Sequence, residues 1–283
     1  MSSYSDTLKG IRKSQGNAVV TRWCQNLNGG NEIISLLTII VASIIVFIFT
    51  TVLTMAGIGA AFIIIPTFYW LGIPLKEAMA IALLLNGFSM IFASIANAKH
   101  KLIIYKVAIP IAVVATIFSP LGAYSSQFVP KNVLVWAFSA FLTFAGSMML
   151  FYKPKQKERP ENTARDIKRG GIIGAFAGYL GGILGVGGGN FIIPVLVGGG
   201  MDPKKASGTT AFVVVFASLA GFLGHAALGS INMTLLIFAS VASIVGAILG
   251  ANMMNSKLKS SQVKVVIGIV LYVVALKMVW GLL

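Results

Sequence analysis

The sequence has few acidic residues. Only 7 of its 283 residues are Asp or Glu, and charged residues of all kinds make up 10% of the chain. A soluble domain carries roughly 25% charged residues, so this chain has too little charge to cover a surface that faces water. Each acidic residue lies in a polar segment or at the end of an apolar one, which leaves no carboxylate in mid-membrane to bind Na⁺ or to carry protons.

Cysteine and histidine are scarce too. Cys24 is the only cysteine, which excludes an internal disulfide, and we assign it no role because it lies in a polar segment. The sequence shows no cluster of His, Cys and Asp, no Ser-His-Asp set within an apolar segment and no paired carboxylates. We therefore expect no enzyme activity, no metal and no cofactor. Of the two histidines, His225 ends an apolar segment and is a candidate for a gating or proton-transfer role.

The sequence is rich in apolar residues. Hydrophobic residues make up 57% of the chain, and runs such as 103–124 and 265–276 are nearly uncharged. About 20 predominantly apolar residues suffice for a helix to cross a bilayer. The alternating segments of about ten residues that a β-barrel would show are absent. The composition predicts an all-α polytopic membrane protein.

The formal net charge is +15. Basic residues gather in the cytoplasmic loops of membrane proteins, and this asymmetry accounts for the charge without a nucleic acid as partner. Aromatic and basic residues are not interleaved as they would be in a nucleic-acid groove. The partners that we expect are the lipid bilayer, a small anion and a second copy of the chain in a homodimer.

The sequence contains an internal repeat. The stretch GIGAAFIIIPTFYWLGIPLKEA at 57–78 aligns without a gap with GVGGGNFIIPVLVGGGMDPKKA at 185–206, and the offset is 128 because the two prolines are residues 66 and 194. The same offset pairs the LGA at 121–123 with the LGA at 249–251. The chain therefore consists of two related halves.

Each half is predicted to hold four membrane-crossing helices, eight in all. A glycine-interrupted segment comes first, at about 35–70 and 170–199. Three uninterrupted spans follow it in each half, at about 77–97, 103–124, 132–152, 205–224, 231–252 and 263–282. We divide the chain into a polar N-terminal cytoplasmic extension (1–32), a first membrane repeat (33–152), a basic cytoplasmic linker (153–169) and a second membrane repeat (170–283).

The basic residues suggest an orientation. With four crossings in each half the repeats are parallel, and 15 of the 22 Lys and Arg residues then share one side with both termini and with residues 99–106. We expect that side to be cytoplasmic, at the inner cell membrane. The alternative is that residues 35–56 cross alone and that the glycine segment after them is a re-entrant hairpin, which would change the parity of crossings and invert the repeats.

The densest glycine cluster is GVGGGNFIIP at 185–194. Gly185, Gly187, Gly188 and Gly189 should break the helix, and the freed backbone groups must then be buried in protein or line a wet cavity. A short helix that starts near Asn190 would present free N–H groups and the positive end of its dipole to an anion. Asn190 would cap this helix or donate to the anion directly.

The alternative is that glycines only allow helices to pack closely. We expect that role alone for Gly174, Gly178, Gly181, Gly182 and the glycines of 246–250.

The first half carries a weaker form of the same pattern. Gly57 and Gly59 correspond to Gly185 and Gly187, and alanines stand where the second half has its last glycines. The substrate-binding residues that we expect in addition to the second glycine cluster are Gly57, Gly59, Pro66, Asn86 and Pro194.

Polar residues follow in DPKKASGTTAF at 202–212. Asp202 is expected to cap a helix with Pro203 in its first turn. The hydroxyl groups one to two turns later could bind an oxyanion, and the alternative is that they bond to the backbone of their own helix. The candidates here are Ser207, Gly208, Thr209 and Thr210.

These residues resemble the sulfite exporter TauE/SafE family. Its pattern is GxGGGxxxxPxL followed by an alanine and a GTS-like triplet, and the second half has GVGGGNFIIPVL at 185–196, then Ala206 and GTT at 208–210. HAALGSIN at 225–232 is similar to the family's loop after that span. The resemblance covers about 36–283. It implies a membrane protein that moves sulfite, sulfonates or other small organosulfur anions, usually outward.

We therefore expect a transporter that exports a small anion. An anion leaving a cell that is negative inside runs down the potential, worth roughly 2.3 kcal/mol per charge per 100 mV, so export needs no coupling ion. The alternatives are a passive anion channel, an uptake permease for another small organic anion, and an assembly subunit that does not transport.

Overall fold

The computed structural model describes residues 36–55, 59–151, 163–199, 201–227 and 231–253, together with 272, 273, 275, 276, 278 and 280. The chain forms two compact units, Met1–Thr38 and Ile39–Leu283, and nearly all described residues belong to the second. Within these ranges all regular secondary structure is helical. The expected all-α architecture is confirmed.

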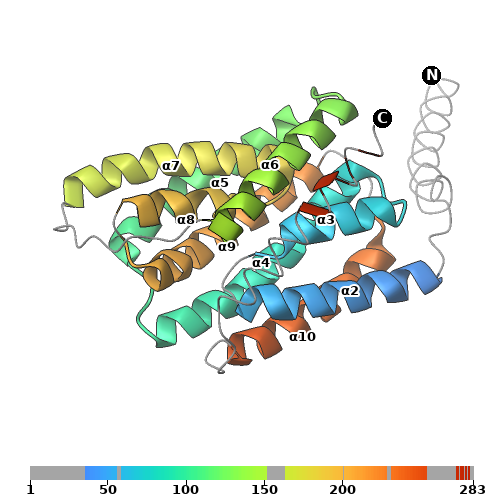
Figure 1. Ribbon diagram of the computed structural model, residues 1–283, viewed down its shortest axis with the longest axis horizontal. Coiled ribbons are helices and arrows are strands. Elements are labelled where there is room, and N and C mark those ends of the chain that lie inside the picture. The colour runs from blue at the N-terminus through green and yellow to red at the C-terminus, as the bar shows by residue number, and fades with distance from the viewer. Residues whose placement is uncertain are drawn as a thin grey trace, which may run out of the picture. The chain divides into compact units, whose positions relative to one another are not determined.

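The helices of the described ranges follow the expected spans closely (Figure 1). Five of them, α2, α4, α5, α9 and α10, are each long and apolar enough to cross a membrane, as a polytopic membrane protein requires. Their bounds are α2 Leu36–Met55, α3 Ala61–Trp70, α4 Leu75–Lys99, α5 Tyr105–Ser125, α6 Lys131–Phe151, α7 Thr163–Leu184, α8 Gly189–Gly198, α9 Pro203–Ala226 and α10 Met233–Met253.

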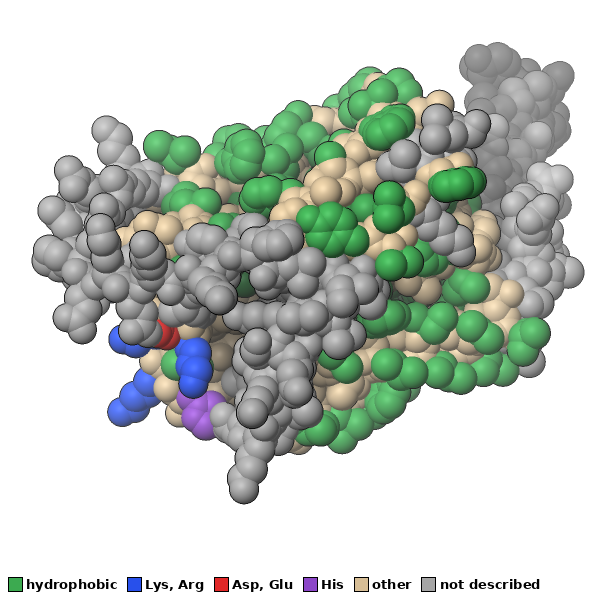
Figure 2. Space-filling model, viewed as in Figure 1, with side chains coloured by type: hydrophobic (Ala, Val, Ile, Leu, Met, Phe, Trp, Pro, Cys, Tyr) green, Lys and Arg blue, Asp and Glu red, His purple; other side chains and the backbone are tan. Residues whose placement is uncertain are grey.

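Apolar side chains remain exposed along the long helices. On α5, Ile109, Val113, Ile117 and Leu121 are spaced by four residues and each is at least half exposed, which places them on one face of the helix. Figure 2 shows apolar side chains over most of the described part of the visible face, while lysine and histidine side chains gather at one edge. A surface of this kind suits hydrocarbon and not water.

Both glycine-interrupted segments are broken into a long helix and a helix of 10 residues, as predicted. Three pairs of helices begin 128 residues apart, at residues 61 and 189 (α3, α8), 75 and 203 (α4, α9), and 105 and 233 (α5, α10). α7 begins at Thr163, inside the range that we assigned to the linker. Residues 1–32, Gly57 and most of the last expected span lie outside the described residues.

Close backbone contacts join α5 to α7. A β-carbon on Gly174 would lie 2.7 Å from the Ile111 oxygen, and one on Gly178 would lie 2.6 Å from the Ala115 oxygen. The two helices therefore run in the same direction and approach more closely than larger side chains would allow. The packing role expected for these glycines is confirmed.

The same kind of contact joins α10 to α2. A β-carbon on Gly250 would overlap the Thr51 oxygen, and one on Gly122 of α5 would overlap the Tyr179 oxygen of α7. Gly122 and Gly250 are 128 residues apart, and so are Thr51 and Tyr179. The first long helix of each half thus packs against the third long helix of the other half.

Helices α4 and α9 cross at the centre in opposite directions. Leu83 lies beside Gly221, and Asn86 beside Ser218. Further along, Met90 and Ala93 pack with Val214 and Ala211. Since residue numbers rise along α4 while those of their partners on α9 fall, the two helices are antiparallel.

This direction corrects our assignment of the loops. The Ile104 N–H donates to Thr209 Oγ1 at 3.0 Å, and a β-carbon on Gly208 would lie 3.0 Å from Leu102 Cβ. The loop between α4 and α5 and the start of α9 therefore lie at one end of the molecule's helical core. We call it the lysine end, residues 99–106 and 202–205. Parallel repeats would put Lys204 and Lys205 on the side opposite to 99–106, and that expectation is wrong.

The opposite end holds the start of α4. Glu77 Oε1 accepts the Asn232 N–H at 2.7 Å, and Lys76 Nζ donates to the Gln127 oxygen at 3.5 Å. We call it the glutamate end, residues 73–77, 126–131 and 231–232. α10 starts here, and α2 runs parallel to it, so the Ile39 end of α2 also lies here. The Ile39 end of α2 therefore lies at the end opposite to residues 99–106, whereas four crossings in each half would put the two at the same end.

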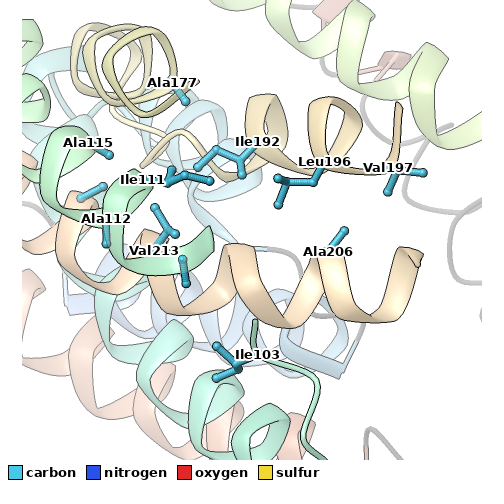
Figure 3. Close-up of a cluster of buried hydrophobic side chains, with 12 residues drawn as sticks. Ile103, Ile111, Ala112, Ala115, Ala177, Ile192, Leu196, Val197, Ala206 and Val213 are labelled. Carbon is cyan, nitrogen blue, oxygen red and sulfur yellow. The ribbon is translucent and has the colours of Figure 1, made fainter. Parts of the chain in front are cut away.

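The short helix α8 folds back along α7. A β-carbon on Gly188 would overlap the Ala177 oxygen, and one on Gly181 would overlap the Gly188 nitrogen. α8 thus returns beside the last turns of α7 instead of continuing it, as in the re-entrant alternative. Its buried face, with Ile192 and Leu196, packs toward α5 and α9 (Figure 3).

Candidate functional site

Three left-handed glycines end α7. Gly185, Gly187 and Gly188 have φ angles of +71°, +70° and +75°. The Val186 N–H donates to the Gly181 oxygen at 2.9 Å, and the Gly185 N–H donates to the Gly182 oxygen at 3.4 Å, which is the bonding pattern of a Schellman motif. Only glycine adopts these angles without strain, so the predicted break is confirmed.

α8 begins at Gly189 without a side-chain cap. Its N-cap is Gly188, and no side chain bonds to the first N–H groups of the helix. Asn190 is the second residue inside the helix, so our expectation that it caps the helix is wrong, because the left-handed Gly188 has already turned the chain. The positive end of the dipole and uncapped N–H groups lie at Gly189 and Asn190.

A proline interrupts each short helix. Pro194 lies inside α8 and Pro66 inside α3. Proline has no N–H, so each ring removes the hydrogen bond to the carbonyl four residues earlier, at Asn190 and Phe62 respectively. Each short helix therefore lacks one backbone hydrogen bond near its start.

The two breaks meet at Asn86. A β-carbon on Gly59 would overlap Asn86 Oδ1, and one on Gly187 would lie 2.9 Å from Asn86 Nδ2. Gly59 and Gly187 are 128 residues apart and precede the starts of α3 and α8. One fully buried amide on α4 is thus in contact with both glycine breaks, and the structure brings together residues that the sequence placed in separate halves.

Ser218 completes this centre and was not among our candidates. Asn86 Nδ2 donates to Ser218 Oγ at 2.9 Å, and a β-carbon on Gly187 would overlap the same oxygen. The repeat could not reveal it, because the residue equivalent to Ser218 is Met90 and the residue equivalent to Asn86 is Val214. Its only signal would have been the antiparallel crossing of α4 and α9, which the sequence did not provide.

The candidates at the start of α9 separate into two groups. Thr209 accepts the Ile104 N–H and Gly208 packs on Leu102, so both hold the loop at the lysine end and not the centre. Thr210 is buried beside α8, since its Cγ2 would lie 3.5 Å from a β-carbon on Gly189, and its hydroxyl has no partner in the described structure. Of this group, Thr210 is the residue that the structure puts next to the break.

Two further expectations concern single residues. Asp202 caps α9 as predicted, accepting the Lys204 N–H at 2.9 Å and the Lys205 N–H at 3.2 Å, with Pro203 as the first helical residue. His225 is buried, and its Nε2 donates to the Gly182 oxygen at 2.8 Å. Its ring therefore contacts the last turn of α7, directly before the break.

The chemistry of the centre is neutral. The buried polar side chains of the described residues are Ser, Thr, Asn and His, without Asp, Glu, Lys or Arg. Among the same residues, no three His, Cys, Asp or Glu side chains come together as a metal site requires. The centre therefore presents backbone N–H groups, hydroxyls, one amide and the starts of two helices, which are groups of the kind that can bind a small anion.

Comparison with known proteins identifies a family. The model of the family described as "Sulfite exporter TauE/SafE" matches residues 42–278. "Probable membrane transporter protein YunE" of Bacillus subtilis is 25% identical over 263 residues, 81% of this chain and 93% of that protein. No solved structure matches the chain.

Proteins of two other organisms are also similar to this chain. "Probable membrane transporter protein MJ0441" of Methanocaldococcus jannaschii is 25% identical over 240 residues, 78% of this chain and 88% of its own. "Sulfite exporter TauE/SafE family protein 6" of Arabidopsis thaliana is 29% identical over 111 residues, 38% of this chain and 26% of its own.

Proposed function

The chain belongs to the sulfite exporter TauE/SafE family of membrane transporters, and we propose on that premise that it exports a small oxyanion, sulfite or another organosulfur anion, across the cell membrane. The observation that carries this proposal is the meeting of two glycine breaks on Asn86. Broken helices whose ends meet near mid-membrane are the substrate sites of many secondary transporters.

The anion would bind between the starts of α3 and α8. Each helix start offers uncapped N–H groups and about half a positive charge from its dipole. Glycines at 59, 187 and 188 let an anion approach the backbone, and Thr210 and Ser218 add hydroxyl donors from α9. We propose Gly185, Gly187, Gly188, Gly189, Asn190, Gly59, Asn86, Thr210 and Ser218 as the binding residues.

We further propose that the two halves are inverted repeats in the membrane. Each would hold four long helices and one re-entrant short helix. Positive charge favours the cytoplasmic side for the lysine end, where Lys99, Lys101, Lys106, Lys204 and Lys205 outnumber the two lysines of the glutamate end, Lys76 and Lys131. The start of α2 then faces outward, at the inner membrane of the cell. A homodimer stays our expectation for the assembly.

Export needs no coupling ion under this proposal. The centre has no carboxylate that could bind Na⁺ or a proton, and the membrane potential alone drives an anion outward. A passive channel would use the same centre without alternating closure. An uptake permease would need a coupling ion, and no described feature favours one.

Flux from liposomes tests the proposal. Purified protein in liposomes loaded with sulfite should release it in proportion to an imposed negative-inside potential, with saturation as the internal concentration rises. Counterflow of external sulfite distinguishes a carrier from a channel. A strict requirement for H⁺ or Na⁺ would contradict uncoupled export, and release of other sulfur anions but not sulfite would change the substrate.

A further inference from the structure

Two residues at equivalent places in the halves carry a buried nitrogen donor. His225 lies near the end of α9 and Asn97 near the end of α4, and they are 128 residues apart. The side chain of His225 is 5% exposed and that of Asn97 is 2% exposed. Because α4 and α9 are antiparallel, Asn97 lies toward the lysine end and His225 toward the glutamate end.

The side chain of His225 bonds to the end of the first long helix of its own half. His225 Nε2 donates to the Gly182 oxygen at 2.8 Å, and the same oxygen accepts the Gly185 N–H of the break. The ring therefore ties α9 to the last turn of α7, where that helix turns back into α8. A shift of α7 relative to α9 would have to break this bond first.

The side chain of Asn97 does not make the equivalent bond to α2, the first long helix of the other half. The residue equivalent to Gly182 is Thr54, in the last turn of α2. Asn97 Nδ2 is buried without a partner, and so is Thr54 Oγ1. Buried donors of native proteins are nearly always paired, so the unpaired amide at this place needs an explanation.

We propose that His225 and Asn97 are a pair of positioning residues that hold the two glycine-broken helices in place in alternation. We call the hydrogen bond from each side chain to the last turn of its broken helix a lock, which is closed when the bond is formed and open when it is not. In the described conformation the His225 lock on α7 is closed and the Asn97 lock on α2 is open. In the other conformation Asn97 donates to the last turn of α2 and His225 releases Gly182. This inference rests on the proposed transport function, because the two locks would act as gates, one at each end of the central site.

Accessibility of the centre to thiol reagents tests the locks without any anion. Cys24 is the only cysteine, so Cys24→Ser provides a background in which Ser89→Cys, one turn from Asn86, is the single reporter. The variants His225→Leu, His225→Gln and Asn97→Leu are compared with that background. A membrane-impermeant thiol reagent is applied separately to each face of sealed vesicles, and size-exclusion chromatography confirms that each variant is folded.

Loss of the closed His225 lock should shift the protein from the described conformation toward the other one. His225→Leu is expected to raise labelling from the glutamate end about tenfold and to lower it from the lysine end. His225→Gln, which keeps a nitrogen donor at a similar distance, should behave like the background. Asn97→Leu should act in the opposite direction, with glutamate-end labelling at or below the background.

Three results would overturn the inference. The first is that labelling of the His225→Leu variant stays within twofold of the background on both faces, and the second is that its labelling rises on both faces. The third is that the His225→Gln variant behaves like the His225→Leu variant. If the labelling shifts as stated but no sulfur anion is transported, the locks stand and the proposed substrate fails. If transport occurs without any shift, the locks fail and the transport function stands.

Discussion

Asn86 is the residue on which the proposed mechanism depends, because among the described residues it contacts both Gly59 and Gly187. Its amide nitrogen bonds to Ser218, while its oxygen lies against Gly59 with no hydrogen-bond partner in the described structure. An unpaired buried acceptor costs about 1–3 kcal/mol. We propose that this oxygen finds a donor in another state of the transport cycle, in which substrate binds or leaves.

Gly187 should tolerate no side chain. Its φ of +70° is strained for alanine by about 1–2 kcal/mol, and the new β-carbon would also overlap Ser218 Oγ. Gly187→Ala is expected to lower the thermal denaturation midpoint in detergent by several degrees. The matched control is Gly198→Ala, since no atom lies within 4 Å of the β-carbon there. Equal midpoints for the two variants would show that the break is not under this constraint.

At the scale of elements, α5 and α7 form the tightest pair that we describe. Glycines at every fourth position of α7 bring its backbone onto α5, and α10 repeats the arrangement on α2. Through these contacts the first long helix of each half packs closely on the third long helix of the other half. The short helices α3 and α8 lie outside these pairs, and they pack on α4 and α9 respectively.

A substitution at Gly182 should open the α5 and α7 pair. A β-carbon there would overlap the Ser119 oxygen, so Gly182→Ala forces the helices apart or strains the backbone, at a cost typical of overpacking of about 1–3 kcal/mol. Gly171→Ala on the same helix meets nothing within 4 Å and serves as the control. We expect a lower yield of monodisperse protein and a lower midpoint for the first variant alone. The packing account fails if both variants match the wild type.

At the scale of the whole molecule, the sequence predicted the parts better than their arrangement. Apolar runs and the offset of 128 placed the helices to within a few residues, because both depend on local composition. The direction of α8 depends on which way three left-handed glycines turn the chain, and composition does not encode that. For the same reason Ser218 was missed, since it reaches Asn86 only through the crossing of α4 and α9.

The inverted arrangement predicts which loops share a membrane face. In a Cys24→Ser background, single cysteines at His100 and Lys205 should be labelled by an impermeant reagent from the same face, because Thr209 ties the two segments together. A cysteine at Phe128, 73% exposed at the glutamate end, should be labelled from the opposite face. Labelling of positions 100 and 205 from different faces would contradict the inverted arrangement and support parallel repeats.

The central claim is that the two breaks and Asn86 form one anion site, and sulfite efflux from liposomes at a fixed negative-inside potential tests it most directly. Asn86→Leu should reduce the initial rate by about tenfold or more, because it removes a buried polar group worth at least 1.4 kcal/mol to a bound anion. Asn132→Leu, at an exposed position on α6, should transport at the wild-type rate. Wild-type efflux through Asn86→Leu would contradict the claim.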